Sequence, residues 1–233
     1  IQPGFSFTAD ISPINAPAED IDMPVLYEDA NVIVVDKPTG VISHARGRYW
    51  DEASVASFIR TRVAELTGER AGIVHRLDRA TSGVMICAKN PETMSFLQKQ
   101  FSQKKKKKEY IAVVKGVVEP TEASIDVPLG RNPKNPKTFM PDSSGKPSQT
   151  YYNVLKQGNE RALVQLKPQT GRTHQIRVHM HYIKHPILGD ELYEGEPAER
   201  LFLHAKSLEI TLPGGKRTVF ESPVPKEIEE QIL

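Results

Sequence analysis

A short polar loop between two apolar runs is the feature that most constrains this chain. Residues 72–83 read Gly-Ile-Val-His-Arg-Leu-Asp-Arg-Ala-Thr-Ser-Gly, and the apolar run 84–86 follows directly. Such apolar runs indicate buried strands, and a loop held between buried strands fixes the direction of its side chains. The loop sets Asp78 between two arginines, which makes it a candidate for a reactive group. The alternative is a surface turn residue paired with Arg76 or Arg79.

The size and composition of the chain fit a globular protein with a sizeable core. It has 233 residues, of which 38% are hydrophobic and 26% are charged. No apolar run approaches the ~20 residues needed to cross a bilayer, and no signal peptide is visible. The single cysteine, Cys87, lies in an apolar, strand-like segment and cannot form an internal disulfide. We therefore expect a buried thiol, a reducing, cytoplasmic location and no membrane partner.

Basic residues are unevenly distributed, although the net charge is only +2. An unbroken run is formed by Lys104, Lys105, Lys106, Lys107 and Lys108. A second basic cluster lies in a segment rich in Pro, Gly and Ser, at residues 130–147. Patches of this kind can bind a phosphate backbone. The run also follows a predicted helix, where the helix dipole favours positive charge, so a solvated helix end is the alternative.

Periodic patterns along the chain predict an α+β protein. We expect strands at residues 31–36, 84–88, 109–118, 123–129, 150–154, 162–166 and 208–212. We expect helices at residues 51–66, at 91–101 with Asn90 as the cap, from a Thr173 cap to Tyr182, and near the C-terminus. Several strands can pair as hairpins, which predicts a mixed, mainly antiparallel sheet flanked by helices. Residues 1–24 are interpreted as a linker or tail, and residues 130–147 as a loop.

A second polar segment could face the first. Residues 169–179 read Gln-Thr-Gly-Arg-Thr-His-Gln-Ile-Arg-Val-His. On a helix, His174, Arg177 and His181 would share one face. A separate core stripe would be formed by Ile176, Met180 and Ile183. Arg177 would then point away from the core, and a guanidinium facing Asp78 would favour the ionised carboxylate that a nucleophile requires.

The histidines of this segment do not predict a metal site. His174 and His179 are five residues apart, and His179 and His181 are two apart, so neither pair shares a helix face. There is no His-Glu-x-x-His pattern and no cysteine partner. We therefore expect no metal, and hydrogen bonds to backbone or phosphate instead.

Three motifs closely resemble those of the RluA-type pseudouridine synthases. They are residues 75–83, residues 109–116, which read Glu-Tyr-Ile-Ala-Val-Val-Lys-Gly, and residues 170–179. Further resemblance lies at residues 27–41, 145–152, 185–190 and 203–205, in the family's order and spacing. It implies the pseudouridine synthase fold with a central active-site cleft, and a catalytic domain at residues 25–233. Many members carry an N-terminal S4-type RNA-binding domain, of which residues 1–12 resemble at most the tail.

The resemblance also implies roles for individual residues. In the family, the aspartate of His-Arg-Leu-Asp is the catalytic nucleophile, here Asp78. The tyrosine of the second motif, here Tyr110, stacks on the target base and is a candidate for moving a proton. The second arginine of the third motif, here Arg177, pairs with the catalytic aspartate. The remaining candidates for holding RNA are Arg76, Arg172, His174, Ile176, Lys104, Lys105, Lys106, Lys107 and Lys108.

The implied activity is isomerisation of uridine to pseudouridine in structured ribosomal or transfer RNA. We expect no cofactor and a monomer. The carboxylate could add to the uracil ring or assist cleavage at C1′, and the sequence leaves both routes open. A glycoside hydrolase is a second hypothesis, but it needs another carboxylate, and the motifs offer only Glu109. A third hypothesis is an RNA-binding assembly factor without activity.

Overall fold

The structure of the protein, a computed structural model, describes residues 21–44, 52–63, 65–66 and 70–232. Most of the predicted tail at residues 1–24 therefore lies outside the described residues. Its last part does not behave as a tail, because Met23 is buried in the main core. No helix in the described part is long and apolar enough to span a bilayer.

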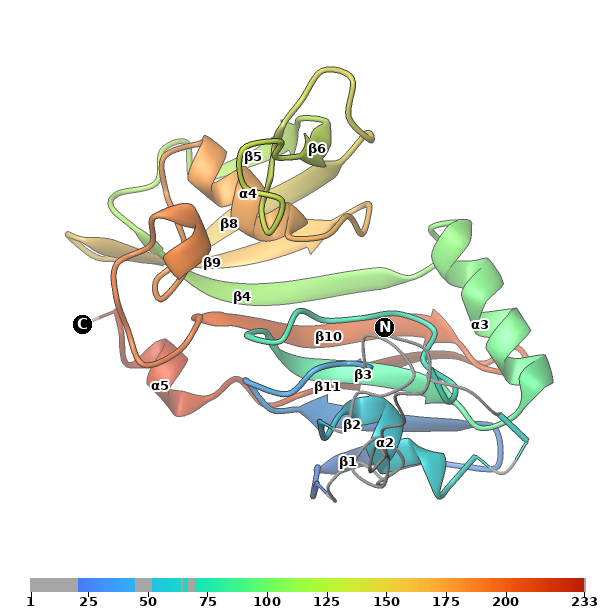
Figure 1. The fold of residues 1–233 in the computed structure, drawn as a ribbon. Coiled ribbons are helices and arrows are strands. Elements are labelled where there is room, and N and C mark those ends of the chain that lie inside the picture. The colour runs from blue at the N-terminus through green and yellow to red at the C-terminus, as the bar shows by residue number, and fades with distance from the viewer. Residues whose placement is uncertain (1–20, 45–51, 64, 67–69, 233) are drawn as a thin grey trace, which may run out of the picture.

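One nine-stranded sheet runs through the molecule (Figure 1). Its strands are β1 (Val25–Glu28), β2 (Val32–Lys37), β3 (Ser82–Ala88), β4 (Lys107–Lys115), β5 (Glu122–Asp126), β8 (Gln149–Gln157), β9 (Arg161–Pro168), β10 (Leu203–Thr211) and β11 (Arg217–Glu221). The strand order is β1-β2-β3-β10-β4-β9-β8-β5, and β11 pairs with β10. Only the β3–β10 pair is parallel among the described strands. The predicted α+β class with a mainly antiparallel sheet is confirmed.

Two strand predictions need correction. The strand expected at residues 123–129 is divided, because β5 ends at Asp126 and a separate strand, β6 (Leu129–Arg131), begins after Val127-Pro128. The segment predicted to be a loop, residues 130–147, contains β7 (Phe139–Pro141), which pairs with β6 as a small second sheet. Short strands of this kind carry too few residues to show a period in the sequence.

The helices flank the sheet as expected, but two of them begin or end elsewhere. They are α2 (Val55–Arg60), α3 (Pro91–Ser102), α4 (Gln175–Tyr182) and α5 (Lys226–Glu229), with a 3-10 turn, η1 (Glu191–Tyr193). Asn90 caps α3 as predicted, and its side chain accepts from the Thr93 N–H at 2.9 Å. The helix expected at residues 51–66 is only α2, whose cap is Ser54. Thr173 does not cap α4, because His174 precedes it in a left-handed conformation with φ 55°.

A glycine allows the loop that carries Asp78 to reach the centre of the sheet. Gly83 has φ +116°, and a Cβ atom added to it would lie 2.3 Å from the Ala205 carbonyl oxygen. Only glycine permits so close an approach in this conformation. Gly83 therefore lets β3 and β10 pair at the point where the Asp78 loop enters the sheet.

The two faces of β4 belong to different cores. Tyr110, Ala112 and Val114 pack into the main core, as the predicted alternation requires, whereas Ile111 and Val113 pack into a second cluster that includes α5. The apolar strand β3 is buried throughout, and it contains Cys87. Burial raises the pKa of this thiol to about 12, so the predicted inert thiol is consistent with the structure.

Candidate active site

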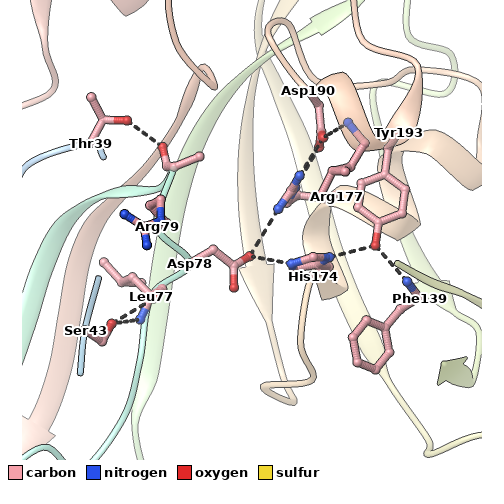
Figure 2. A network of polar contacts seen from close by, with 12 residues as sticks. Thr39, Ser43, Leu77, Asp78, Arg79, Phe139, His174, Arg177, Asp190 and Tyr193 are labelled. Carbon is pink, nitrogen blue, oxygen red and sulfur yellow. Dashed lines mark hydrogen bonds and ion pairs between the residues drawn. The ribbon is translucent and has the colours of Figure 1, made fainter. Parts of the chain in front are cut away.

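The loop before β3 is fixed on both sides of Asp78. Ser43 Oγ donates to the Leu77 carbonyl at 2.8 Å and accepts from the Leu77 N–H at 3.0 Å (Figure 2). On the other side, Thr39 Oγ1 donates to the Ala80 carbonyl at 2.8 Å. Because residues before and after it are tied to one segment, Asp78 projects from a rigid support.

A buried lysine supports the same loop. Lys37 is fully buried, and its Nζ donates to the carbonyls of Pro38 at 2.8 Å, Val41 at 2.7 Å and Arg79 at 3.2 Å. In the sequence, Lys37 is marked only by its place in the family-like segment 27–41. Arg79 itself turns away from Asp78 and pairs with Glu52, so the alternative of an Asp78–Arg79 surface pair is wrong.

Arg177 lies beside Asp78, as the sequence predicted. Its Nη1 is 3.6 Å from Asp78 Oδ2. Its tighter partner is Asp190, which accepts from Nε at 2.8 Å and from Nη2 at 2.7 Å (Figure 2). Burial opposes the charge of Arg177, but Asp190 and Asp78 together raise its pKa, so the guanidinium stays charged. The two-point contact with the fully buried Asp190 holds Arg177 in place and leaves Nη1 directed at Asp78.

His174 also faces Asp78, with Nε2 at 3.9 Å from Oδ2. The Tyr193 hydroxyl accepts from the Phe139 N–H at 2.9 Å and lies 2.8 Å from His174 Nδ1. We assign the Tyr193 hydroxyl as the donor in this contact (Figure 2), which places the proton of a neutral ring on Nε2, on the side of Asp78. Burial lowers the pKa of His174 although Asp78 opposes the shift, which favours this neutral ring.

The arrangement corrects one argument made from the sequence. His174 does not share a helix face with Arg177, because α4 begins one residue later. The left-handed turn at His174, rather than helical spacing, brings it to the carboxylate. Asp190 and Tyr193 were not predicted to position these residues. Asp190 ends the family-like segment 185–190 and Tyr193 lies in η1, but no period in the sequence relates either residue to α4.

Asp78 opens onto a cleft of about 390 Å³. The predicted residues that line it are Arg76, Asp78, Lys104, Lys106, Lys108, Tyr110, Arg172, His174, Ile176 and Arg177. Asp78 is the only carboxylate among the described residues that line this cleft. Tyr110 is largely buried in the wall, and burial together with Asp78 raises its pKa, so its hydroxyl stays protonated at neutral pH.

Only the first lysines of the run form a helix end, where the Lys104 and Lys105 N–H groups donate to the carbonyls of Phe101 at 3.3 Å and Gln100 at 2.9 Å. Helix α3 ends at Ser102, and β4 begins at Lys107. Lys105 and Lys107 do not line the cleft, and Lys107 instead pairs with Glu209 at 3.1 Å. The run therefore divides into side chains that line the cleft and side chains that lie outside it.

The remaining histidines have structural partners. His179 Nδ1 lies 2.9 Å from Thr150 Oγ1, and its Nε2 lies 3.1 Å from the Val127 carbonyl. His75 accepts from the Ile86 N–H at 3.1 Å, and burial lowers its pKa to about 3. In residues 21–44, 52–63, 65–66 and 70–232, no group of three or more His, Cys, Asp or Glu side chains could hold a metal ion.

The cleft gives no support to a glycoside hydrolase. Glu109, the acid that the hypothesis required, pairs with Lys206 at 3.2 Å and does not line the cleft. A retaining hydrolase needs two carboxyl groups ~5–5.5 Å apart, and an inverting one also needs a pair. The described part of the cleft offers Asp78 alone.

The cleft therefore brings together an aspartate paired with an arginine, a tyrosine and several basic side chains, all of them from the three sequence motifs or the lysine run. Residues 31–182 match the family model described as RNA pseudouridylate synthase. The chain belongs to the RluA-type family of RNA pseudouridine synthases, which are isomerases that convert uridine to pseudouridine in RNA.

Similar proteins include the ribosomal large subunit pseudouridine synthase D of Borreliella burgdorferi, 43% identical over 218 residues. The dual-specificity RNA pseudouridine synthase RluA of Salmonella typhi is 42% identical over 214 residues. Each match covers 89% of this chain. The first match covers 67% of the Borreliella burgdorferi protein, and the second covers 95% of the Salmonella typhi protein. The ribosomal large subunit pseudouridine synthase D of Nitrosomonas europaea is 35% identical over 223 residues. That match covers 91% of this chain and 64% of the relative.

A solved structure has the same fold. Human RNA Pseudouridylate Synthase Domain Containing 1 superposes with a TM-score of 0.74 at 27% sequence identity. The match covers 89% of this chain and 86% of that chain. The pseudouridine synthase fold expected from the sequence motifs is therefore confirmed.

Proposed function

We propose that this chain isomerises uridine to pseudouridine in structured RNA, with Asp78 as the nucleophile. The observation that carries the proposal is the Asp78–Arg177 pair. Asp78 is the single carboxylate among the described residues that line the cleft. It faces the guanidinium of Arg177, which Asp190 holds in place. A charged, fixed cation favours the ionised carboxylate, which is the form that can attack carbon.

The reaction needs no oxidant, reductant or group donor. The bond between N1 and C1′ breaks, the base turns, C5 bonds to C1′, the C5 proton leaves and N1 takes up a proton. Asp78 can support this by adding to the ring or by taking C1′, and both routes remain open. Either route requires the uridine to leave its stack in the folded RNA.

The other residues of the cleft divide the remaining tasks. We assign Tyr110 to stacking on the everted base, because its ring lies in the wall of the cleft and its hydroxyl stays protonated. Arg76 is exposed at the cleft and is suited to fill the space that the base leaves or to hold a phosphate. Arg172, His174 and Ile176 complete the opposite wall.

We infer ribosomal RNA as the first substrate class and transfer RNA as the second. The relatives support this order, since two are named for the large ribosomal subunit and one for dual specificity. We further propose that residues 25–233 act as the catalytic domain, that the protein works as a monomer without a cofactor, and that it acts in the cytoplasm.

The proposal is tested by mapping pseudouridine in cellular RNA with and without the gene. We expect at least one uridine of ribosomal or transfer RNA to lose its modification and to regain it when the gene is restored. Purified protein should modify the same uridine in an unmodified transcript. If no position changes in the cell and no transcript is modified, the assembly-factor hypothesis replaces the enzymatic one.

Neutralising the outer lysines should weaken RNA binding and its salt dependence. We expect a variant with Gln at Lys104, Lys105, Lys106 and Lys107 to bind less tightly, with a salt slope smaller by about 0.7 for each lost contact to a single-stranded phosphate. Filter binding over a salt series would measure both.

A matched control removes the same charge elsewhere, with Gln at the exposed Lys115, Lys184, Lys216 and Lys226. We expect this control to bind as the unaltered protein does. Equal binding by the two variants would mean that the lysine run is only a solvated surface.

A further inference from the structure

Lys108 turns its side chain to the cleft, as Lys104 and Lys106 do, whereas Lys105 and Lys107 do not line it. Lys108 precedes Tyr110 by two residues on β4, so the two side chains lie on the same face of the strand. Both line the cleft, and Lys108 Nζ lies 5.9 Å from the centre of the Tyr110 ring. Lys107, on the other face, pairs with Glu209.

The ammonium group of Lys108 has no acidic partner in the part of the chain that the structure describes. Among the described residues, no carboxylate lies within ion-pairing distance of its Nζ. The side chain is nevertheless half-buried, and a Cβ atom added to Gly171 on the opposite wall would lie 3.5 Å from Nζ. A cation held without a counter-ion in a narrow cleft is available to a ligand that brings negative charge.

The chemistry of the cleft identifies the part of the ligand that Lys108 would meet. Stacked rings have their centres ~4.5–7 Å apart. Lys108 Nζ lies over the face of the Tyr110 ring, 5.9 Å from its centre, so a base that enters to stack on that ring would meet the ammonium group. The edge of uracil carries two exocyclic oxygens, which accept hydrogen bonds.

We propose that Lys108 donates to an exocyclic oxygen of the everted uracil and stabilises the negative charge that the base acquires when it leaves C1′. This inference rests on the proposed function. The electron pair of the N1–C1′ bond moves onto the base, where N1 and the two oxygens share the charge. That charge is withdrawn when C5 bonds to C1′, loses its proton and N1 is protonated. Lys108 keeps its proton throughout and acts through its charge.

The groups around Lys108 determine its expected titration. The charged and titratable residues that line the cleft with it are Lys104 and Lys106 before β4, Tyr110 on β4, His75, Arg76 and Asp78 in the loop before β3, Arg172 and His174 before α4, and Arg177 on α4. Burial, with the charge of Lys106, lowers the pKa of Lys108 to about 8. The stabilising charge is thus present below this pH and is lost as the pH rises through about 8.

The test compares Lys108→Met and Lys108→Arg with the unaltered protein. We expect Lys108→Met to lower kcat by roughly 10²-fold and to leave RNA affinity within about threefold. Lys108→Arg should keep most of the activity, because it keeps a charged donor. In the unaltered protein, the rate should fall as pH rises through about 8. That alkaline limb should move to higher pH in Lys108→Arg, because a guanidinium keeps its proton.

The matched control is Lys115→Met at the other end of β4, where the lysine is exposed and lies 3.9 Å from Glu196. We expect its kcat to be unchanged, and thermal melts should show that all three variants fold. If Lys108→Met binds more weakly with a shallower salt slope and an unchanged kcat, Lys108 is only a phosphate contact and the inference is wrong. An unmoved alkaline limb in Lys108→Arg would also overturn it, even if the methionine variant failed to fold. A failure of the proposed function can be distinguished from a failure of this inference, because in the first case the unaltered protein itself would form no pseudouridine.

Discussion

Asp78→Asn is expected to abolish pseudouridine formation and to leave RNA binding nearly unchanged. The amide has the same shape as the carboxylate but cannot act as a nucleophile. Removal of a nucleophile costs many orders of magnitude, so the product should fall below detection, at least about 10⁴-fold lower. Because C5 loses its proton in the reaction, release of tritium from RNA labelled at C5 of uridine would measure the rate.

Two further measurements make this result specific to the carboxylate. RNA affinity by filter binding should change little, because Asp78 carries no positive charge that a phosphate would need. Asp78→Glu should also be strongly impaired, because the loop is fixed on both sides and a longer side chain misplaces the carboxylate. Tritium release by Asp78→Asn at a rate near that of the unaltered protein would rule out Asp78 as the nucleophile.

Arg177→Met should lose activity and stability together. It removes the cation 3.6 Å from Asp78, so we expect the rate to fall at least about 10²-fold. The fully buried Asp190 would also lose its partner, at a cost of about 3–5 kcal/mol in the free energy of unfolding.

The double variant Arg177→Met with Asp190→Asn separates the two effects. The amide keeps the shape of the side chain and removes the buried charge, so most of the stability should return in urea unfolding. Activity should stay low, because the guanidinium beside Asp78 is still absent. Recovery of activity along with stability would mean that Arg177 acts only on the fold.

The features that were predicted correctly from the sequence depend on residues that are close together in the chain. The Asn90 cap, the apolar strand β3 and the hairpin between β8 and β9 each follow from a local pattern, and the structure has all three. The placement of Arg177 beside Asp78 was predicted from the family motifs and from a helix face, and the distance between them agrees.

The features that were missed depend on contacts between distant segments. No period reveals that Asp190 and Tyr193 reach back to Arg177 and His174, because the η1 segment has its own short turn geometry. The left-handed backbone of His174 is equally hidden, since only a few per cent of residues other than glycine adopt it. The division of the lysine run could not be predicted, because it depends on where β4 begins, and a row of identical residues does not show where a strand begins.

The position of the site at the middle of the sheet has a consequence for how the protein matures. The strands β1, β2 and β3 lie on one side of the β10–β4 pair, and β9, β8 and β5 lie on the other (Figure 1). Asp78 comes from the first side, and Arg177 and His174 come from the second. Because β10 arrives late in the chain and joins β3 to β4, a nascent or half-folded polypeptide holds the two parts of the site unjoined. We therefore expect the site to be assembled only after β10 has joined the sheet, late in folding.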